Sequence, residues 1–209
     1  MVSIDSLIAF CGALVIIYAL PGPDMALILT TSARSGWRAG LTASGGLAIA
    51  RTAHVTLSAC GIAALIQHSP WVYNAVRYGG ALYLAYVAVQ IFRSPAFVMK
   101  KDDAEKNLSS PAFPLFMKGM LTSLLNPKAL LFCSVLLPQF IKPSQGSVMI
   151  QMVELGALLV IAGAIFDATY AIGASRISNW LAHHPSAQTV QRWTFSAALL
   201  GFALRLSLD

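Results

Sequence analysis

Two charged residues of opposite sign each follow a proline inside a long apolar stretch. Asp24 ends the sequence Pro21-Gly22-Pro23-Asp24, and Lys128 ends the sequence Asn126-Pro127-Lys128. Such a charge costs about 2.5–3.5 kcal/mol on insertion scales when it lies alone at the centre of a membrane helix, so each needs a partner. We expect Asp24 to bind a ligand's ammonium group and Lys128 its carboxylate. A purely structural Asp24–Lys128 ion pair is the alternative.

The prolines should also leave backbone groups without their helical hydrogen-bond partners. Because a proline lacks an N–H and its ring clashes with the carbonyl four residues earlier, we expect free carbonyl oxygens at Ile17, Ala19 and Ser123. Gly22 and Asn126 each precede a proline, as the N-cap of a restarted helix does. Free carbonyls and N–H groups at this depth are tolerated where they line a cavity, although a plain proline kink is the alternative. The predicted substrate-binding residues are Pro21, Gly22, Pro23, Asp24, Asn126, Pro127 and Lys128.

Three further polar residues lie in apolar stretches. Arg51 and His54 are three positions apart and would share one face of a helix. Asp167 lies deep enough in a later stretch to pair with Arg51. We expect these residues to line a pathway, with Asp167 and His54 as candidates to accept a coupled proton. The alternative is an Arg51–Asp167 bridge that only fixes helix packing.

The composition requires elements that face lipid. The chain has 209 residues, of which 57% are hydrophobic and 11% charged, and its mean hydropathy is +0.69. A bilayer crossing needs about 20 apolar residues, and runs without strict alternation favour helices over barrel strands. We predict an all-α, polytopic membrane protein with a single transmembrane domain, residues 1–209. Its six spans are Leu7–Thr30, Gly40–Ile66, Val72–Phe92, Phe113–Phe140, Met149–Ile172 and Trp193–Leu208.

The chain divides into two halves of three spans each. The first repeat covers about residues 1–93, a polar cytoplasmic link about 94–112, and the second repeat about 113–209. Because three is odd, the second half must enter the membrane from the opposite side. Aligning the two proline breaks sets Asp24 against Lys128. The sequence therefore predicts two inverted three-helix repeats with the first helix of each repeat broken at proline.

Basic residues are concentrated in alternate connections. The net charge is +6, but most Lys and Arg residues lie in or beside the first, third and fifth connections, so a nucleic-acid partner is not expected. The positive-inside rule places these connections in the cytoplasm and both termini outside. The residues concerned are Arg34, Arg38, Arg93, Lys100, Lys101, Lys106, Lys118, Arg176 and Arg192.

Signatures of enzymes, cofactors and metals are weak. Cys11, Cys60 and Cys133 are dispersed in apolar stretches without a Cys-x-x-Cys pair, which argues against a thiol-redox protein. His183 and His184 precede a proline in a connection, and we expect loop residues there, not metal ligands. No cofactor is expected. Close helix contacts are expected at glycines, within one subunit or in a homodimer: Gly36, Gly40, Gly45, Gly46, Gly79 and Gly80.

Four segments resemble one known family. They are Pro21–Leu27 (PGPDMAL), Ser35–Gly40 (SGWRAG), Leu121–Ala129 (LTSLLNPKA) and Leu137–Phe140 (LPQF). Together, and at this spacing, they resemble the LysE/RhtB family of bacterial amino-acid exporters, and the RhtB-like branch more closely than the lysine exporters. The resemblance covers nearly the whole chain.

The resemblance implies an exporter in the bacterial inner membrane, driven as an antiporter by the proton gradient. Its cargo would be an amino acid or close derivative such as homoserine, threonine, homoserine lactone, leucine or a basic amino acid. Arg51 departs from the small or acidic residue that the family pattern leads us to expect, which disfavours lysine and arginine as cargo. A non-transporting membrane assembly subunit and a membrane-embedded thiol-redox protein are the alternatives.

Overall fold

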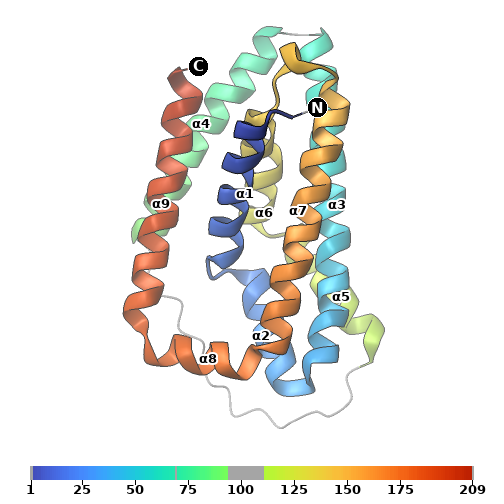
Figure 1. Ribbon diagram of the computed structural model, residues 1–209, viewed down its shortest axis with the longest axis vertical. Helices are drawn as coiled ribbons and strands as arrows, with labels where there is room; N and C mark the ends of the chain where they lie inside the picture. Colours follow the sequence, from blue (N-terminus) through green and yellow to red (C-terminus); the bar gives the residue numbers. More distant parts are fainter. Residues whose placement is uncertain (1, 69, 94–110, 209) are drawn as a thin grey trace.

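The chain forms a bundle of helices in which a break interrupts the first apolar segment of each half (Figure 1). The structure is a computed structural model that describes residues 2–68, 70–93 and 111–208. Over these residues all regular structure is helical, which confirms the all-α prediction. The elements are α1 (Ile4–Ala19), α2 (Pro23–Ser35), α3 (Trp37–His68), α4 (Pro70–Arg93), α5 (Ala112–Leu124), α6 (Pro127–Leu131), a π-helical turn η1 (Phe132–Leu136), 3₁₀ turns η2 (Leu137–Phe140) and η3 (Pro143–Gln145), α7 (Val148–Ile172), α8 (Ala174–His183) and α9 (Pro185–Leu208).

The six apolar stretches predicted as spans lie within these helices, apart from the two breaks. Within the described residues, α7 alone is long and apolar enough to cross a membrane. Two bent pairs also qualify if each is one span: α1 with α2, bent by 53°, and Ala112–Leu124 with Lys128–Phe140, bent by 61°. Length and composition of the described residues thus support up to 3 spans, and six spans stay a prediction.

Both breaks restart a helix as the prolines predict. Gly22 has an extended backbone and is the N-cap of α2, with a proline in its first turn. Asn126 is the N-cap of α6, and its Oδ1 accepts a hydrogen bond of 3.0 Å from the backbone N–H of Lys128. The second restart soon leaves regular α-helical geometry and continues as η1 and η2. Pro138 lies in η2 and cannot donate the backbone hydrogen bond that an α-helix would need there.

The two halves approach most closely where α3 packs along α5. A Cβ added to Gly46 would lie 2.0 Å from the carbonyl oxygen of Phe116, and one added to Gly119 would lie 2.0 Å from that of Ala43. These distances leave no room for a side chain, so the two helices touch backbone to backbone. This contact lies within one subunit and fixes α3 of the first half against the second half.

We therefore expect Gly46→Ala to destabilise the protein by about 1–3 kcal/mol, the usual cost of overpacking. Gly45→Ala is the matched control, because a Cβ at Gly45 meets only ring carbons of Phe116 at an ordinary 3.6 Å. Thermal unfolding of the two purified variants in the same detergent measures the difference. Equal melting temperatures for both would contradict this packing.

An apolar cluster links α1 to the segment after the second break. The ring of Phe10 on α1 packs against Phe132 and Phe140, with centroid distances of 5.9 and 5.1 Å. Met152 and Leu155 of α7 are fully buried in the same cluster. Because α1 ends at the first break and Phe132 follows the second, this cluster holds the two breaks side by side.

Helix α8 was not predicted and joins α7 to α9 across one end of the bundle (Figure 1). The expectation that His183 and His184 lie in a loop is wrong, since they are the last residue and the C-cap of α8. The Nδ1 atom of His183 lies 2.7 Å from the carbonyl oxygen of Asn179, one turn earlier. The segment buries Ala174 and exposes Trp180, and such a two-faced sequence forms a helix at a surface, too short to span.

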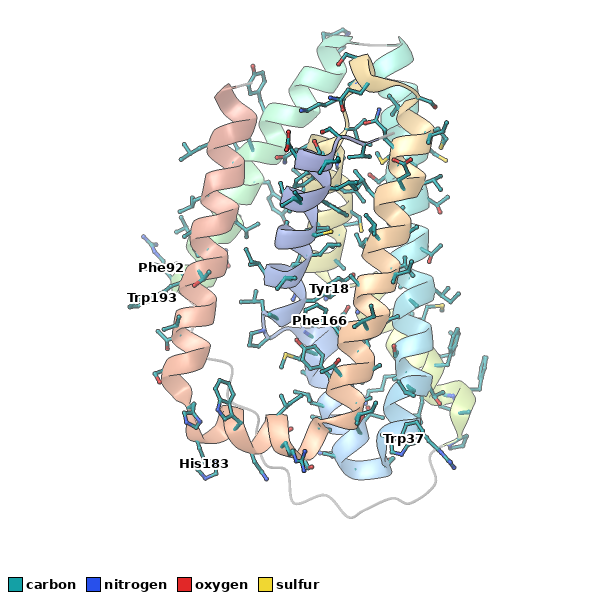
Figure 2. The ribbon with its side chains drawn as sticks, in the orientation of Figure 1. Tyr18, Trp37, Phe92, Phe166, His183 and Trp193 are labelled. Carbon is teal, nitrogen blue, oxygen red and sulfur yellow. The ribbon has the colours of Figure 1, made fainter. Side chains whose placement is uncertain are left out.

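Helices α4 and α9 pack as a pair beside the rest of the bundle (Figure 1). Phe92 and Trp193 stack between them, with ring centroids 5.8 Å apart (Figure 2). The two chain ends lie at the same end of the bundle, opposite α8 (Figure 1). The predicted link, about residues 94–112, falls almost wholly outside the described residues.

Candidate functional site

A cavity of about 40 Å³ lies where the two breaks meet α3 and α7. Four charged residues that were predicted from the sequence line this cavity: Asp24 from α2, Arg51 from α3, Lys128 from α6 and Asp167 from α7. Most of the remaining wall is apolar and includes Met25, Phe132 and Leu159. The structure thus gathers groups that are far apart in the sequence around one small space.

Asp24 receives three hydrogen bonds, two of them from the second break. Its Oδ1 accepts from Asn126 Nδ2 at 2.8 Å, and its Oδ2 accepts from Ser123 Oγ at 3.2 Å. The third donor is Arg51 Nη2, 3.1 Å from Oδ2. The side chain of Asp24 is 14% exposed, so it keeps limited access from the cavity. A partly accessible carboxylate is suited to bind a cationic group.

Arg51 bridges two carboxylates. Its Nη1 donates to Asp167 Oδ2 at 2.8 Å and its Nη2 to Asp167 Oδ1 at 3.2 Å, while Nη2 also reaches Asp24. Ser44, two turns before Arg51 on α3, donates its hydroxyl to Asp167 at 3.0 Å. The Arg51 and Asp167 side chains are each 3% exposed. The expected Arg51–Asp167 contact is therefore present, and the same guanidinium is the cation beside Asp24.

Lys128 binds the backbone of the first break. Its Nζ donates to the carbonyl oxygens of Ile17 at 2.8 Å and Leu20 at 3.0 Å. Because residue 21 is a proline, the carbonyl of Ile17 lacks its usual helical donor, as the sequence predicts. The C-terminal end of α1 also favours a positive charge. Lys128 thus caps α1 across the boundary between the two halves.

The alternative of a purely structural Asp24–Lys128 ion pair is not found, because Asp24 pairs with Arg51 within the described part of the chain. Each break instead supplies partners to the other. Asp24 of the first break accepts from Ser123 and Asn126 of the second. Lys128 of the second break donates to the end of α1 in the first. Separating the halves at this point would break both sets of contacts.

Two tyrosines that the sequence did not single out complete the wall. The guanidinium carbon of Arg51 lies 5.1 Å from the ring centroid of Tyr18, which stacks on Phe166 of α7 (Figure 2). The Tyr18 hydroxyl donates to the carbonyl of Leu159 at 2.9 Å, and the Tyr170 hydroxyl donates to the carbonyl of Tyr18 at 2.7 Å. A tyrosine three residues before Pro21, inside an apolar run, was the available signal for Tyr18.

The remaining predicted residues are not part of the cavity's lining. His54 is buried one turn after Arg51, and its Nδ1 has no hydrogen-bond partner among the described residues. Gly22 lies beside the Lys128 side chain, since a Cβ added there would be 3.2 Å from Nζ. Pro21 and Pro23 shape the first break, and Pro127 occupies the first turn of α6.

Comparison with known proteins identifies the family. The model of the LysE type translocators matches residues 15–209. The chain belongs to the LysE type translocator family. LysE type translocators are transporters and not enzymes, so the thiol-redox alternative is not supported. The three cysteines are also free, with Cys11 and Cys60 exposed and Cys133 buried.

Two curated proteins are similar to the chain over most of its length. The chain is 28% identical over 191 residues to a leucine efflux protein of Enterobacter sp. (strain 638), covering 91% of this chain and 90% of the relative. It is 27% identical over 199 residues to an uncharacterized membrane protein of Pseudomonas aeruginosa, covering 92% and 90%. No solved structure matches the chain.

Proposed function

We propose that this translocator exports amino acids or close derivatives, such as leucine, threonine, homoserine or homoserine lactone, across the bacterial inner membrane in exchange for protons. The observation that supports this proposal is the cavity at the crossing of the two breaks, where carboxylates and cations face one small space. The amino acids of this class are zwitterions, which need both signs of charge close together. The name of the leucine efflux relative supports the same class of cargo.

Asp24 is the proposed ligand of the cargo's ammonium, because it is the more accessible of the two carboxylates. Arg51 replaces Lys128 as the proposed ligand of the cargo's carboxylate. Its guanidinium lines the cavity and has five N–H groups, of which three bind Asp24 and Asp167, so two remain for a carboxylate. Lys128 points its ammonium at backbone carbonyls and is less well placed for this role.

The cavity walls favour a cargo with an uncharged side chain. Met25, Phe132 and Leu159 offer apolar surface to the cargo's side chain. At about 40 Å³ the cavity is far smaller than the roughly 300 Å³ at which ligand pockets begin. Loading therefore requires the contacts between the two breaks to separate, which is also the movement needed for alternating access.

The proposed architecture is six spans in two inverted repeats with the cargo site near the middle of the membrane. The reciprocal contacts of Asp24 and Lys128 support it, because each charged residue binds the opposite break. The positive-inside rule supports cytoplasmic placement of the end that contains α8, with both termini outside. A homodimer is part of the proposal on the basis of the small number of spans.

Transport into inverted membrane vesicles tests this function. Respiring vesicles that contain the protein should accumulate one or more labelled neutral amino acids above the level of vesicles without it, and an uncoupler should abolish the difference. Lysine and arginine should accumulate less. Equal uptake of every tested amino acid and lactone with and without the protein would contradict amino-acid export.

A further inference from the structure

The ammonium of Lys128 is held in an unusual way for a partly buried cation. Within the described residues its Nζ contacts two acceptors, both of them backbone carbonyl oxygens, and no carboxylate lies within ion-pair distance. An ammonium has three N–H groups. Two suffice for Ile17 and Leu20, so Nζ can lose one proton and keep both hydrogen bonds. The nitrogen that remains would present a lone pair at the cavity that Lys128 lines.

We propose that Lys128 binds the proton that this transporter exchanges for cargo, an inference that rests on the proposed function. A charged Lys128 repels the ammonium of an arriving cargo. A neutral Lys128 accepts a hydrogen bond from that ammonium while Asp24 balances its charge. Cargo and the third proton of Lys128 therefore exclude one another from the site, which is the requirement for antiport.

The other charged groups of the cavity are less suited to this exchange. Arg51 does not lose its proton in proteins. The carboxylate of Asp24 faces donors from Arg51, Ser123 and Asn126, and that of Asp167 faces donors from Arg51 and Ser44. A proton added to either carboxylate would remove the negative charge that pairs with Arg51 and so weaken these bonds. Loss of a proton from Lys128 breaks none.

The groups that face Lys128 come from every element around the cavity. Asp24 on α2 and Asp167 on α7 favour the charged ammonium, whereas Arg51 on α3 opposes it. The hydroxyls of Tyr18 and Tyr170 and the thiol of Cys133 are neutral parts of the wall, the hydroxyls being bound to backbone carbonyls. The two carboxylates and two cations balance, so the site is neutral when Lys128 is charged and no cargo is bound.

The exchange conserves protons and charge. On the cytoplasmic side Nζ releases one proton to water and the cargo enters with its own ammonium and carboxylate. On the outer side the cargo leaves unchanged and Nζ takes one proton from water. Each cycle thus moves one zwitterion out and one proton in. Because the loaded site has one negative charge and the empty site none, the cycle also moves one positive charge inward.

Purified protein in liposomes with a trapped pH-sensitive dye tests this inference. Addition of a transported neutral amino acid outside wild-type liposomes should raise the internal pH, because protons leave as cargo enters. Lys128→Met should lose this change, and any exchange of labelled for unlabelled cargo that it retains should not respond to a pH gradient. Lys118→Met, at an exposed lysine of α5, is the matched control and should behave as wild type.

A second variant covers the case in which Lys128→Met does not fold. Lys128→Arg keeps a cation at the carbonyls that cannot lose its proton, so it should fold and yet fail to bind or exchange cargo at any pH. Proton movement driven by cargo in Lys128→Met, or normal proton-coupled transport by Lys128→Arg, would overturn the inference. Loss of coupling in Asp167→Asn or His54→Gln with coupling intact in Lys128→Met would assign the proton to those residues.

The failure of this inference and that of the proposed function give different results. If wild-type liposomes transport no amino acid, the proposed function fails and the inference with it. If wild type transports an amino acid without moving protons, or either lysine variant remains coupled, amino-acid export stands and only the role of Lys128 is overturned.

Discussion

Asp24→Asn should abolish most transport without unfolding the protein. The substitution removes the proposed counter-charge of the cargo's ammonium but keeps the size of the side chain and one oxygen for Ser123 or Asn126. Truncating one partner of a buried charged pair costs about 2–5 kcal/mol. Since every 1.4 kcal/mol is a factor of ten, transport should fall by roughly 30- to 4,000-fold.

The measurement is uptake of labelled cargo into inverted vesicles, normalised to the amount of folded protein in the membrane. Asp5→Asn is the matched control, because Asp5 is exposed in the first turn of α1 and undergoes the same chemical change. It should transport within about twofold of wild type, as surface substitutions change little. Full activity of Asp24→Asn would show that this carboxylate is not the ammonium ligand.

Arg51→Met should destabilise the folded protein by about 3–5 kcal/mol, the usual cost of removing one partner from a buried ion pair. The variant leaves Asp24 and Asp167 next to each other, with Asp167 almost fully buried and no cation in contact with either. It also removes the charge that lies over the ring of Tyr18. The melting temperature of purified protein in detergent measures the effect.

Two further variants make the assignment specific. Arg176→Met removes an exposed arginine of α8 and should leave the melting temperature within the scatter of surface substitutions. Asp167→Asn added to Arg51→Met removes the uncompensated buried charge and should recover part of the lost stability. If Arg51→Met had the same melting temperature as wild type in detergent, the bridge from Arg51 to Asp24 and Asp167 would be contradicted.

The breaks could be predicted because their cause is local. A proline removes a particular backbone hydrogen bond wherever the fold places it, so Ile17 could be named from the sequence as a carbonyl without its helical donor. The same expectation is wrong for Ser123, whose carbonyl accepts a hydrogen bond of 3.1 Å from the N–H of Asn126. The Arg51–Asp167 contact was also accessible, since a buried arginine requires a carboxylate and few were available. The contact of the Lys128 ammonium with the end of α1 could not be predicted, because the sequence does not show which chain segment lies next to the lysine side chain.

Partners across the two halves depended on helix packing. Periodicity indicates which face of a helix is polar but not which helix that face meets, so the contact of Asp24 with Arg51 was not predicted. Gly163 of α7 illustrates the missing information: a Cβ there would come within 2.5 Å of Arg51 Nη1. An isolated glycine in an apolar run gives no sign that it makes room for a guanidinium. Helix α8 was missed because its short polar sequence was interpreted as a connection.

Binding of one cargo and its two single-charge analogues to the purified protein would test the central claim most directly. Leucine is compared with 4-methylpentanoate, which lacks the ammonium, and 3-methylbutylamine, which lacks the carboxylate; threonine and homoserine serve as cargo if leucine does not bind. The crossing of the two breaks, with Asp24 and Arg51 in its wall, predicts saturable binding and a raised melting temperature with the amino acid alone. Equal binding by either analogue would contradict a site that recognises both charges.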